Sequence, residues 1–294
     1  MHEIIFLSFY ILILAFLFKQ KLKINLYVCL FMSLIVFMII FINVNPYKTD
    51  ENKLSSLNYI SDKYKPKSDY LTKMDLNEMQ YPFIIKPNVC SKQSIGVAVI
   101  RNKNDYDNYF KSNSFKKEDL IYQNFIPHKN EVGILYEKDL ITGKGKIISV
   151  VKKNSANTDI MPSCSFGVTC SDLTEFITPE LDKVFDEISR SIPNYNAGRF
   201  DVKYKDEKSL FEGKDLYILE ANGTMGFDLR KGTTNIVMAS YYINRWIVHR
   251  ILYGIKNIVT FNGYDLAENF IVILKCFNNL LICKDWEKLF ARYS

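Results

Sequence analysis

Two long apolar runs near the start of the chain most restrict what it can fold into. Ile4–Phe18 and Ile24–Val44 contain no charged residue and extend over 15 and 21 residues. A helix needs roughly 20 apolar residues to cross a bilayer, so the second run is long enough and the first is marginal. A signal peptide is the alternative for the first run, and a buried core helix is the alternative for the second. We therefore expect residues 1–44 to form a membrane anchor of one or two transmembrane helices.

The overall composition argues against several classes of function. The chain has 38 basic and 32 acidic residues, and a net charge of +6 is too small to predict a nucleic-acid partner. There is no CxxC pair and there are only three histidines, which disfavours a zinc site. Cysteines scattered through a long chain favour reduced thiols. They are Cys29, Cys90, Cys164, Cys170, Cys276 and Cys283.

The remainder of the chain divides into a polar stretch, a body and an apolar end. Residues 45–80 are polar and lysine-rich, with Pro46 and Pro66, and we interpret them as a linker and a short lead-in. Residues 81–234 alternate between strand-like and helix-like patterns, which predicts an α+β domain. Residues 235–294 are mainly apolar and helix-like, and we expect a C-terminal helical segment that caps the domain or lies on the membrane.

Within the body, apolar runs predict short strands, and one motif predicts a helix start. Thr178-Pro179-Glu180 combines a cap residue, a proline in the first turn and an acid near the positive end of the helix dipole. A second helix is expected to begin within residues 105–111. Strands are expected over residues 81–87, 95–100, 120–126, 131–136, 146–151, 198–204 and 216–221.

The first two of these strands enclose a polar loop, NVCSKQS, at residues 88–94, which predicts a hairpin flap. Lys86 ends the strand before the loop and precedes Pro87. A lysine in this position can direct its compact charge at phosphate groups. The alternative is a strand-end lysine that extends its ammonium into solvent.

The last two strands carry the acidic residues that point to chemistry. Residues two apart on a strand project to one side, so Arg199 and Asp201 share a face, as do Glu220 and Asn222. If the strands pair antiparallel through a hairpin connection over residues 205–213, their oxygen atoms converge. Mg²⁺ prefers such oxygen ligands, and an arginine beside them can neutralise a transferring phosphoryl group. The alternative is carboxylates that simply face water.

The order of these motifs resembles a known superfamily. KP at Lys86, the polar loop closed by SIGV, GRFDV around Asp201 and ILEANGTMG around Glu220 are similar to motifs of the ATP-grasp superfamily, especially D-alanine–D-alanine ligases and related carboxylate–amine ligases. The resemblance covers roughly Tyr81 to Gly232. It implies an ATP-grasp fold over residues 81–234, in which two α+β subdomains grip ATP.

The resemblance also implies roles for individual residues. Lys86 would contact the nucleotide phosphates, and the loop with Ser91, Ser94 and Gly96 would close over them through backbone N–H groups. Arg199 would be catalytic and steady the transition state. Gln123 stands where the family often has a ribose-binding glutamate, Glu131 would lie near the nucleotide, and Lys152, or else Lys153, would contact a phosphate. The metal ligands would be Asp201, Glu220 and Asn222, holding two Mg²⁺ ions, with Mn²⁺ as a possible substitute.

The implied reaction is an ATP-dependent ligation that forms C–N bonds. A carboxylate takes the γ-phosphoryl group to become an acyl phosphate, and an amine or thiol then attacks. The partners would be ATP, a small-molecule or peptide carboxylate and amine, and the membrane. The alternative is an ATP-binding, membrane-anchored module or degenerate homologue without ligase activity, because the loop lacks the family's glycines and the lead-in is short.

Two further departures from the family pattern limit what the resemblance implies. The family's N-terminal part supplies a further ATP-contacting lysine, and here Lys73 is close in sequence but matches no motif. Gly223-Thr224-Met225-Gly226 differs from the ligase pattern, so the identity of the substrates does not follow. Arg230, Lys231 and Thr233 either grip an anionic substrate or lie on the surface.

The expected location is a membrane, with the catalytic domain facing the cytosol because ATP is there. The lysines between the two apolar runs favour a cytoplasmic position for that link. If both runs span the membrane, the domain would then lie outside. A first run that does not span would remove the conflict.

Overall fold

The computed structural model describes residues 28, 53–75, 80–88, 94, 96–139, 142–154, 169–193, 195, 197–222 and 229–232. Apart from Val28, the predicted membrane anchor lies outside these residues, as does nearly all of the predicted flap and all of the C-terminal helical segment. Within the described ranges, no helix is long and apolar enough to cross a membrane. The anchor therefore stays a prediction.

The described residues form an α+β structure with two antiparallel sheets, as the sequence predicts. The smaller sheet has the strand order β1-β4-β2-β3. Its strands are β1 (Ser68–Tyr70), β2 (Phe83–Pro87), β3 (Ala98–Ile100) and β4 (Leu120–Asn124). The larger sheet has the order β7-β6-β5-β8-β9. Its strands are β5 (Asn130–Lys138), β6 (Gly145–Lys153), β7 (Cys170–Asp172), β8 (Ala197–Tyr204) and β9 (Leu216–Asn222).

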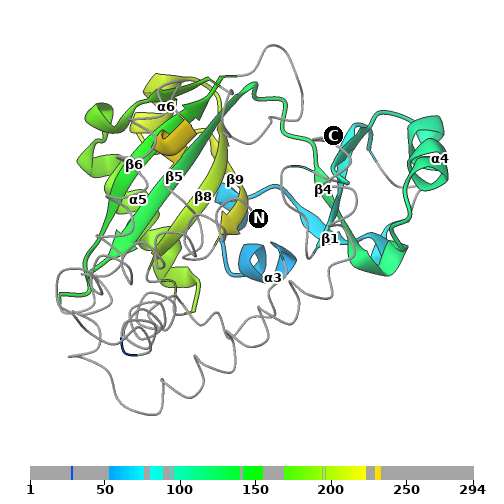
Figure 1. Ribbon diagram of the computed structural model, residues 1–294, viewed down its shortest axis with the longest axis horizontal. Coiled ribbons are helices and arrows are strands. Elements are labelled where there is room, and N and C mark those ends of the chain that lie inside the picture. The colour runs from blue at the N-terminus through cyan, green and yellow to red at the C-terminus, as the bar shows by residue number, and fades with distance from the viewer. Residues whose placement is uncertain are drawn as a thin grey trace.

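Four α-helices and several single turns complete the described structure. The α-helices are α3 (Lys53–Asn58), α4 (Lys103–Ser112), α5 (Pro179–Ser191) and α6 (Glu207–Phe211). The 3-10 turns are η1 (Asp62–Tyr64), η2 (Leu71–Lys73), η3 (Lys117–Asp119), η4 (Thr174–Phe176) and η5 (Leu229–Gly232). Figure 1 shows the two sheets side by side, with α4 on the outer side of the smaller sheet and α3 between the sheets. Contacts of α3 with both β9 and β1 agree with this view.

The core of the larger sheet explains why one of its faces is left for polar residues. On β8, Phe200, Val202 and Tyr204 are fully buried in a hydrophobic cluster that includes Phe185 of α5. The predicted helix start is confirmed, since the Thr178 hydroxyl accepts a hydrogen bond from the Leu181 N–H at 3.2 Å. Because side chains alternate along a strand, the residues between these core positions project from the opposite face.

Within the segment interpreted as linker and lead-in, residues 53–75 are part of the fold. Residues 53–75 contain α3, β1 and two 3-10 turns, and Leu54, Leu57, Ile60 and Leu71 are buried. Leu54, Leu57 and Ile60 recur every three residues, which is helical spacing. The pattern covers too few residues to stand out from the surrounding lysines.

The hairpin connection over residues 205–213 is confirmed, since β8 and β9 pair antiparallel. It contains α6, capped by Asp206, whose side chain accepts a hydrogen bond from the Ser209 N–H at 2.8 Å. One expectation about the cysteines needs correction. Cys170 is disulfide-bonded, whereas the composition favoured reduced thiols. Cysteine spacing alone does not reveal such a pairing, since it depends on which strands and loops meet.

Candidate active site

The pairing of β8 with β9 brings the predicted acidic residues together. Arg199 lies opposite Asn222, and Asp201 lies opposite Glu220. The Arg199 Nε donates to Asp201 Oδ1 at 3.1 Å, and the Asn222 side-chain amide donates to Asp201 Oδ2 at 3.3 Å. The Asp201 side chain is 12% exposed, whereas the Glu220 side chain is 28% exposed. The predicted antiparallel pairing and shared face are therefore confirmed, and Glu220 is the carboxylate more open to a ligand.

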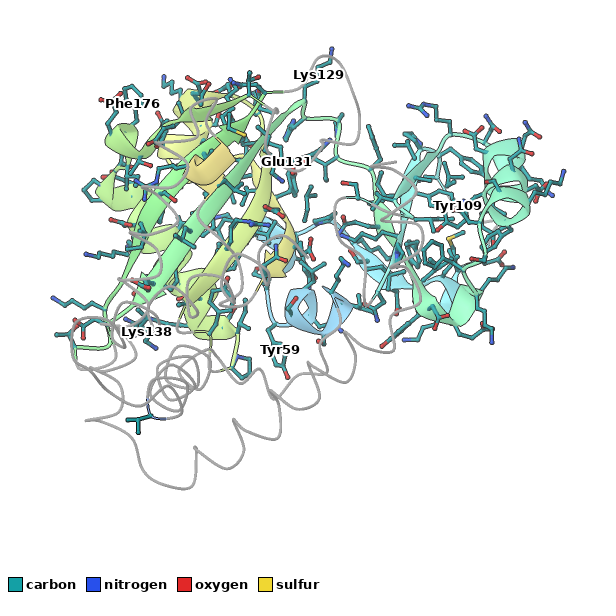
Figure 2. All side chains as sticks on the ribbon, viewed as in Figure 1. Tyr59, Tyr109, Lys129, Glu131, Lys138 and Phe176 are labelled. Atoms are coloured by element: carbon teal, nitrogen blue, oxygen red, sulfur yellow. The ribbon has the colours of Figure 1, made fainter. Side chains whose placement is uncertain are left out.

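A buried lysine and a second carboxylate extend this cluster across the sheet. The Lys153 ammonium on β6 pairs with Glu131 of β5 and lies 3.4 Å from Asp201 Oδ1. Both the Lys153 and the Glu131 side chains are almost fully buried. Figure 2 shows Glu131 on the side of the larger sheet that faces the smaller sheet. The charges of Glu131, Lys153, Asp201 and Arg199 thus alternate along one face.

This alternation determines the protonation of the central groups. Burial alone would raise the pKa of Asp201, but the Arg199 guanidinium and the Lys153 ammonium lower that pKa to about 2. Burial likewise opposes the charged form of Lys153, yet Asp201 and Glu131 raise the pKa of its ammonium above the ordinary value. At neutral pH, Asp201 is an anion and Lys153 a cation.

Lys86 reaches this cluster from the other sheet. Its ammonium donates to Gln123 Oε1 at 3.1 Å within the smaller sheet and to the Leu219 carbonyl at 2.9 Å on β9. The register between β8 and β9 shifts after Asp201, so Leu219 is an extra residue in the ladder and its carbonyl can accept from a side chain. Burial lowers the pKa of Lys86 to about 8, although the Glu220 charge acts in the opposite direction.

The position of Gln123 is fixed from both ends. Its carbonyl oxygen accepts from Lys86, and its amide nitrogen donates to the Ser68 hydroxyl at 3.0 Å. Gln123 is 2% exposed, so it lies beneath Lys86 and supports that ammonium directly. A contact with a ribose, which the resemblance implies, stays a prediction.

Sequence reasoning missed Lys53, which lies at the start of α3. Its ammonium donates to the Pro87 carbonyl at 3.2 Å and lies 3.8 Å from Glu220 Oε1. Asn88 holds the start of this helix in place, since its side-chain oxygen accepts from the Leu54 N–H at 3.0 Å. Lys73, which was close in sequence to the expected further lysine, pairs with Asp69 at 3.1 Å on an exposed surface instead.

Lys152 is the predicted site residue that the structure places elsewhere. Its ammonium pairs with Glu207 of α6 at 2.9 Å, and both side chains are partly exposed. Because Lys152 and Lys153 are adjacent on β6, they leave opposite faces of the sheet, and only Lys153 joins the cluster. The sequence pattern that could have distinguished Lys153 from Lys152 is weak, because β6 is buried on both faces over most of its length.

The base of the predicted flap is described only in part. β2 and β3 pair antiparallel, which confirms the hairpin, and Ser94 and Gly96 have positive φ angles of 60° and 74°. A Cβ at Gly96 would lie 2.5 Å from the Phe115 ring, so only glycine fits there without a shift. Ser91 lies outside the described residues, and closure over phosphates stays a prediction.

Beyond β9, η5 covers part of the same sheet face. A Cβ at Gly133, which lies opposite Asp201, would come within 2.3 Å of Leu229 Cδ1. Gly133 therefore allows η5 to approach the sheet closely. Arg230 is 7% exposed, so of the two alternatives for this residue, a surface position is wrong.

The donor atoms fit a hard cation that also binds phosphate. In the described part of the chain, no three His, Cys, Asp or Glu side chains group into a metal cluster. Asp201, Glu220 and Asn222 provide two carboxylates and one amide on a single face. Mg²⁺ is usually bound by one or two carboxylates together with water and substrate phosphates, so this donor set suits it better than a cation that needs an all-protein cage.

Comparisons with known proteins give partial likenesses. No protein-family model matches the chain, and no curated protein matches it. Among solved structures, an N5-carboxyaminoimidazole ribonucleotide synthetase in complex with ADP is 17% identical with a TM-score of 0.41, over 59% of this chain and 44% of that chain. A D-alanine–D-alanine ligase from Bacillus anthracis is 14% identical with a TM-score of 0.44, over 70% and 68%.

A D-alanine–D-alanine ligase from Helicobacter pylori is 15% identical with a TM-score of 0.41, over 69% of this chain and 60% of that chain. The chain spans less than two thirds of this ligase and less than half of the synthetase. The structural matches therefore include the ligases that the sequence motifs resemble. Likenesses of this extent assign no activity to this chain.

Proposed function

We propose that this protein is a Mg-ATP-dependent carboxylate–amine ligase of the ATP-grasp type. The observation that carries the proposal is the meeting of two sets of residues. Asp201, Glu220 and Asn222 share one face of β8 and β9, and Lys86 reaches the same strand from the smaller sheet. Acidic oxygens beside a buried cation form the combination that a metal–triphosphate group requires.

The site residues divide into two groups by what holds them. Asp201 is fixed by Arg199, Lys153 and Asn222, so it would present one oriented carboxylate to Mg²⁺. Glu220 lies 3.8 Å from the Lys53 ammonium and is more exposed. When bound, Mg²⁺ would neutralise phosphate charge. Lys53 and Lys86, one from α3 and one from β2, would then bind phosphate oxygens as point charges.

The reaction supported by this arrangement proceeds in two steps. An oxygen of the substrate carboxylate attacks the γ-phosphorus of ATP, which forms an acyl phosphate and releases ADP. The nitrogen of the amine then attacks the acyl carbon, loses a proton, and displaces inorganic phosphate. Arg199 would bind a substrate oxygen that gains negative charge in either step. Positioning and electrostatic stabilisation supply most of the rate in such transfers.

Glu220→Gln in the full-length chain is the sharpest test, because the Glu220 side chain is 28% exposed and glutamine keeps its size. Circular dichroism checks that the variant folds, since Glu220 also pairs with Lys53. We expect ATP-dependent phosphate release, measured over a panel of carboxylates and amines, to fall about a hundredfold or more. Asp201→Asn should do the same, with circular dichroism used to check its folding. Glu207→Gln, which alters only an exposed pair with Lys152, is the matched control.

Unchanged turnover in Glu220→Gln would contradict the proposal. Binding of Mg-ATP by the wild type without phosphate release, whatever the carboxylate and amine, would favour the alternative of a nucleotide-binding module. Failure of the wild type to bind Mg-ATP would exclude both functions.

A further inference from the structure

Helix α3 lies across the two sheets and holds a lysine beside a candidate metal ligand. Leu57 in α3 and Ile60 just after it belong to the hydrophobic cluster of the larger sheet. At the other end of the helix, the Lys53 N–H donates to the Asn88 carbonyl at 2.9 Å, next to the end of β2 in the smaller sheet. Figure 1 shows α3 between the sheets. The backbone of Lys53 is therefore fixed, and its side chain is only 11% exposed.

The Lys53 ammonium lies beside the carboxylate that is more open to a metal ion. It is 3.8 Å from Glu220 Oε1 and donates to the Pro87 carbonyl at 3.2 Å. On the proposed function, on which this inference rests, Glu220 is a ligand of Mg²⁺. A divalent cation bound to Glu220 would come close to this ammonium, and like charges at short range repel each other. The ammonium and the metal therefore compete for one carboxylate.

The charge of the surrounding cluster adds to this repulsion. Its described side chains carry one more positive than negative charge. The cations are Lys53, Lys86, Lys153 and Arg199, and the anions are Glu131, Asp201 and Glu220. A bare divalent cation increases this excess, whereas a triphosphate reverses it. A triphosphate also offers the Lys53 ammonium new anionic oxygen atoms, which a lysine binds as a point charge.

We propose that Lys53 is an internal counter-ion of Glu220, which disfavours binding of a bare divalent cation and releases the carboxylate when a triphosphate binds. Metal binding and nucleotide binding are then coupled, because each makes the other more favourable by the same factor. A site of this kind takes up its metal with the nucleotide rather than before it.

Three roles for Lys53 predict different results in one measurement, the affinity for a divalent cation in the absence of nucleotide. If Lys53 competes with the cation, replacing Lys53 by an uncharged residue tightens cation binding. If Lys53 only contacts phosphate, the replacement has no effect until nucleotide is present. If Lys53 only holds α3 against β2, the replacement loosens the site and weakens cation binding.

The experiment titrates the full-length chain with Mn²⁺, as a stand-in for Mg²⁺, and follows the free ion by electron paramagnetic resonance. We expect Lys53→Met to bind Mn²⁺ about tenfold more tightly than the wild type, because it removes a charge 3.8 Å from a ligand oxygen. Lys53→Arg keeps the charge and should bind as weakly as the wild type. In a Glu220→Gln background, Lys53→Met should have no effect. Lys73→Met, which removes the cation of an exposed pair with Asp69, is the matched control and should bind as the wild type does.

Equal or weaker Mn²⁺ binding by Lys53→Met would overturn the inference while leaving the proposed function intact. A gain in affinity that persists in the Glu220→Gln background would also overturn it. If circular dichroism shows that Lys53→Met does not fold, Lys53→Gln, whose amide can still donate to the Pro87 carbonyl, decides by the same comparison. Failure of the wild type to bind Mg-ATP in calorimetry defeats the proposed function, and this inference with it.

Discussion

The cost of keeping Lys86 charged inside the protein can be measured directly. Burial lowers the pKa of its ammonium from 10.5 to about 8. A gap of about 2.5 pH units corresponds to about 3 kcal/mol, since each unit is worth about 1.4 kcal/mol. The folded protein releases this proton near pH 8, whereas the unfolded chain keeps it to about pH 10.5. The unfolded state therefore binds more protons within this window, so the contribution of Lys86 to stability rises with pH there.

Lys86→Met removes the titrating group and keeps a side chain of similar length. Urea unfolding of the full-length chain, followed by circular dichroism from pH 7 to pH 10.5, gives the difference in unfolding free energy between wild type and variant. We expect the wild type to gain about 3 kcal/mol relative to Lys86→Met across this range. Other groups, such as the tyrosines, titrate in both proteins and cancel in the difference. The exposed Lys205→Met variant should follow the wild type at every pH.

If the difference in unfolding free energy between wild type and Lys86→Met stays constant from pH 7 to pH 10.5, this reasoning is refuted. Such a result would mean that the ammonium is solvated, and the proposed phosphate contact would then lose its desolvated cation. A saturating ligand that places phosphate against Lys86 should reduce the pH dependence, because a neighbouring negative charge favours the protonated form.

Two further contrasts test the fold around the site by urea unfolding. Lys153→Met should cost about 3 kcal/mol, because it leaves Glu131 buried without its cation and removes one of the two cations beside Asp201. Lys152→Met should cost about 0.5 kcal/mol or less, and equal losses would contradict the assignment of the two faces. Gly145→Ala should cost about 2 kcal/mol or more, since its Cβ would lie 1.5 Å from the Tyr136 hydroxyl. Gly143→Ala should cost about 1 kcal/mol, because its Cβ would meet no atom within 4 Å but its φ is 67°. A larger loss of unfolding free energy in Gly143→Ala than in Gly145→Ala would contradict the packing.

The sequence was sufficient where one face of a strand is polar and the other apolar. On β8, apolar residues at Phe200 and Val202 alternate with Arg199 and Asp201, so the shared face of the acidic cluster could be predicted from a period of two. The same alternation was absent from β6, where residues 149–151 are all buried. The choice between Lys152 and Lys153 therefore depended on pairing with β5, which no local pattern shows.

Lys53 could not be placed from the sequence for a different reason. Its helix has six residues, which is below the length at which periodicity can be recognised. Its role comes from contacts with Pro87 and Glu220, which belong to two different sheets and are distant along the chain. Such contacts arise from tertiary packing, and the surrounding lysines and prolines instead favoured a linker.

The buried charges are arranged in a way that stability alone does not explain. Replacing a buried ion pair by apolar residues is often neutral or stabilising, so a row of Glu131, Lys153, Asp201 and Arg199 is not needed to hold the sheet together. The row does keep Asp201 ionised and oriented. Lys53 and Lys86, in contrast, connect α3 and the smaller sheet to β9 through Glu220 and the Leu219 carbonyl. On the proposed function, a triphosphate with its metal would take over these two cations and Glu220 while Asp201 keeps its place, because only the former contacts cross between the sheets.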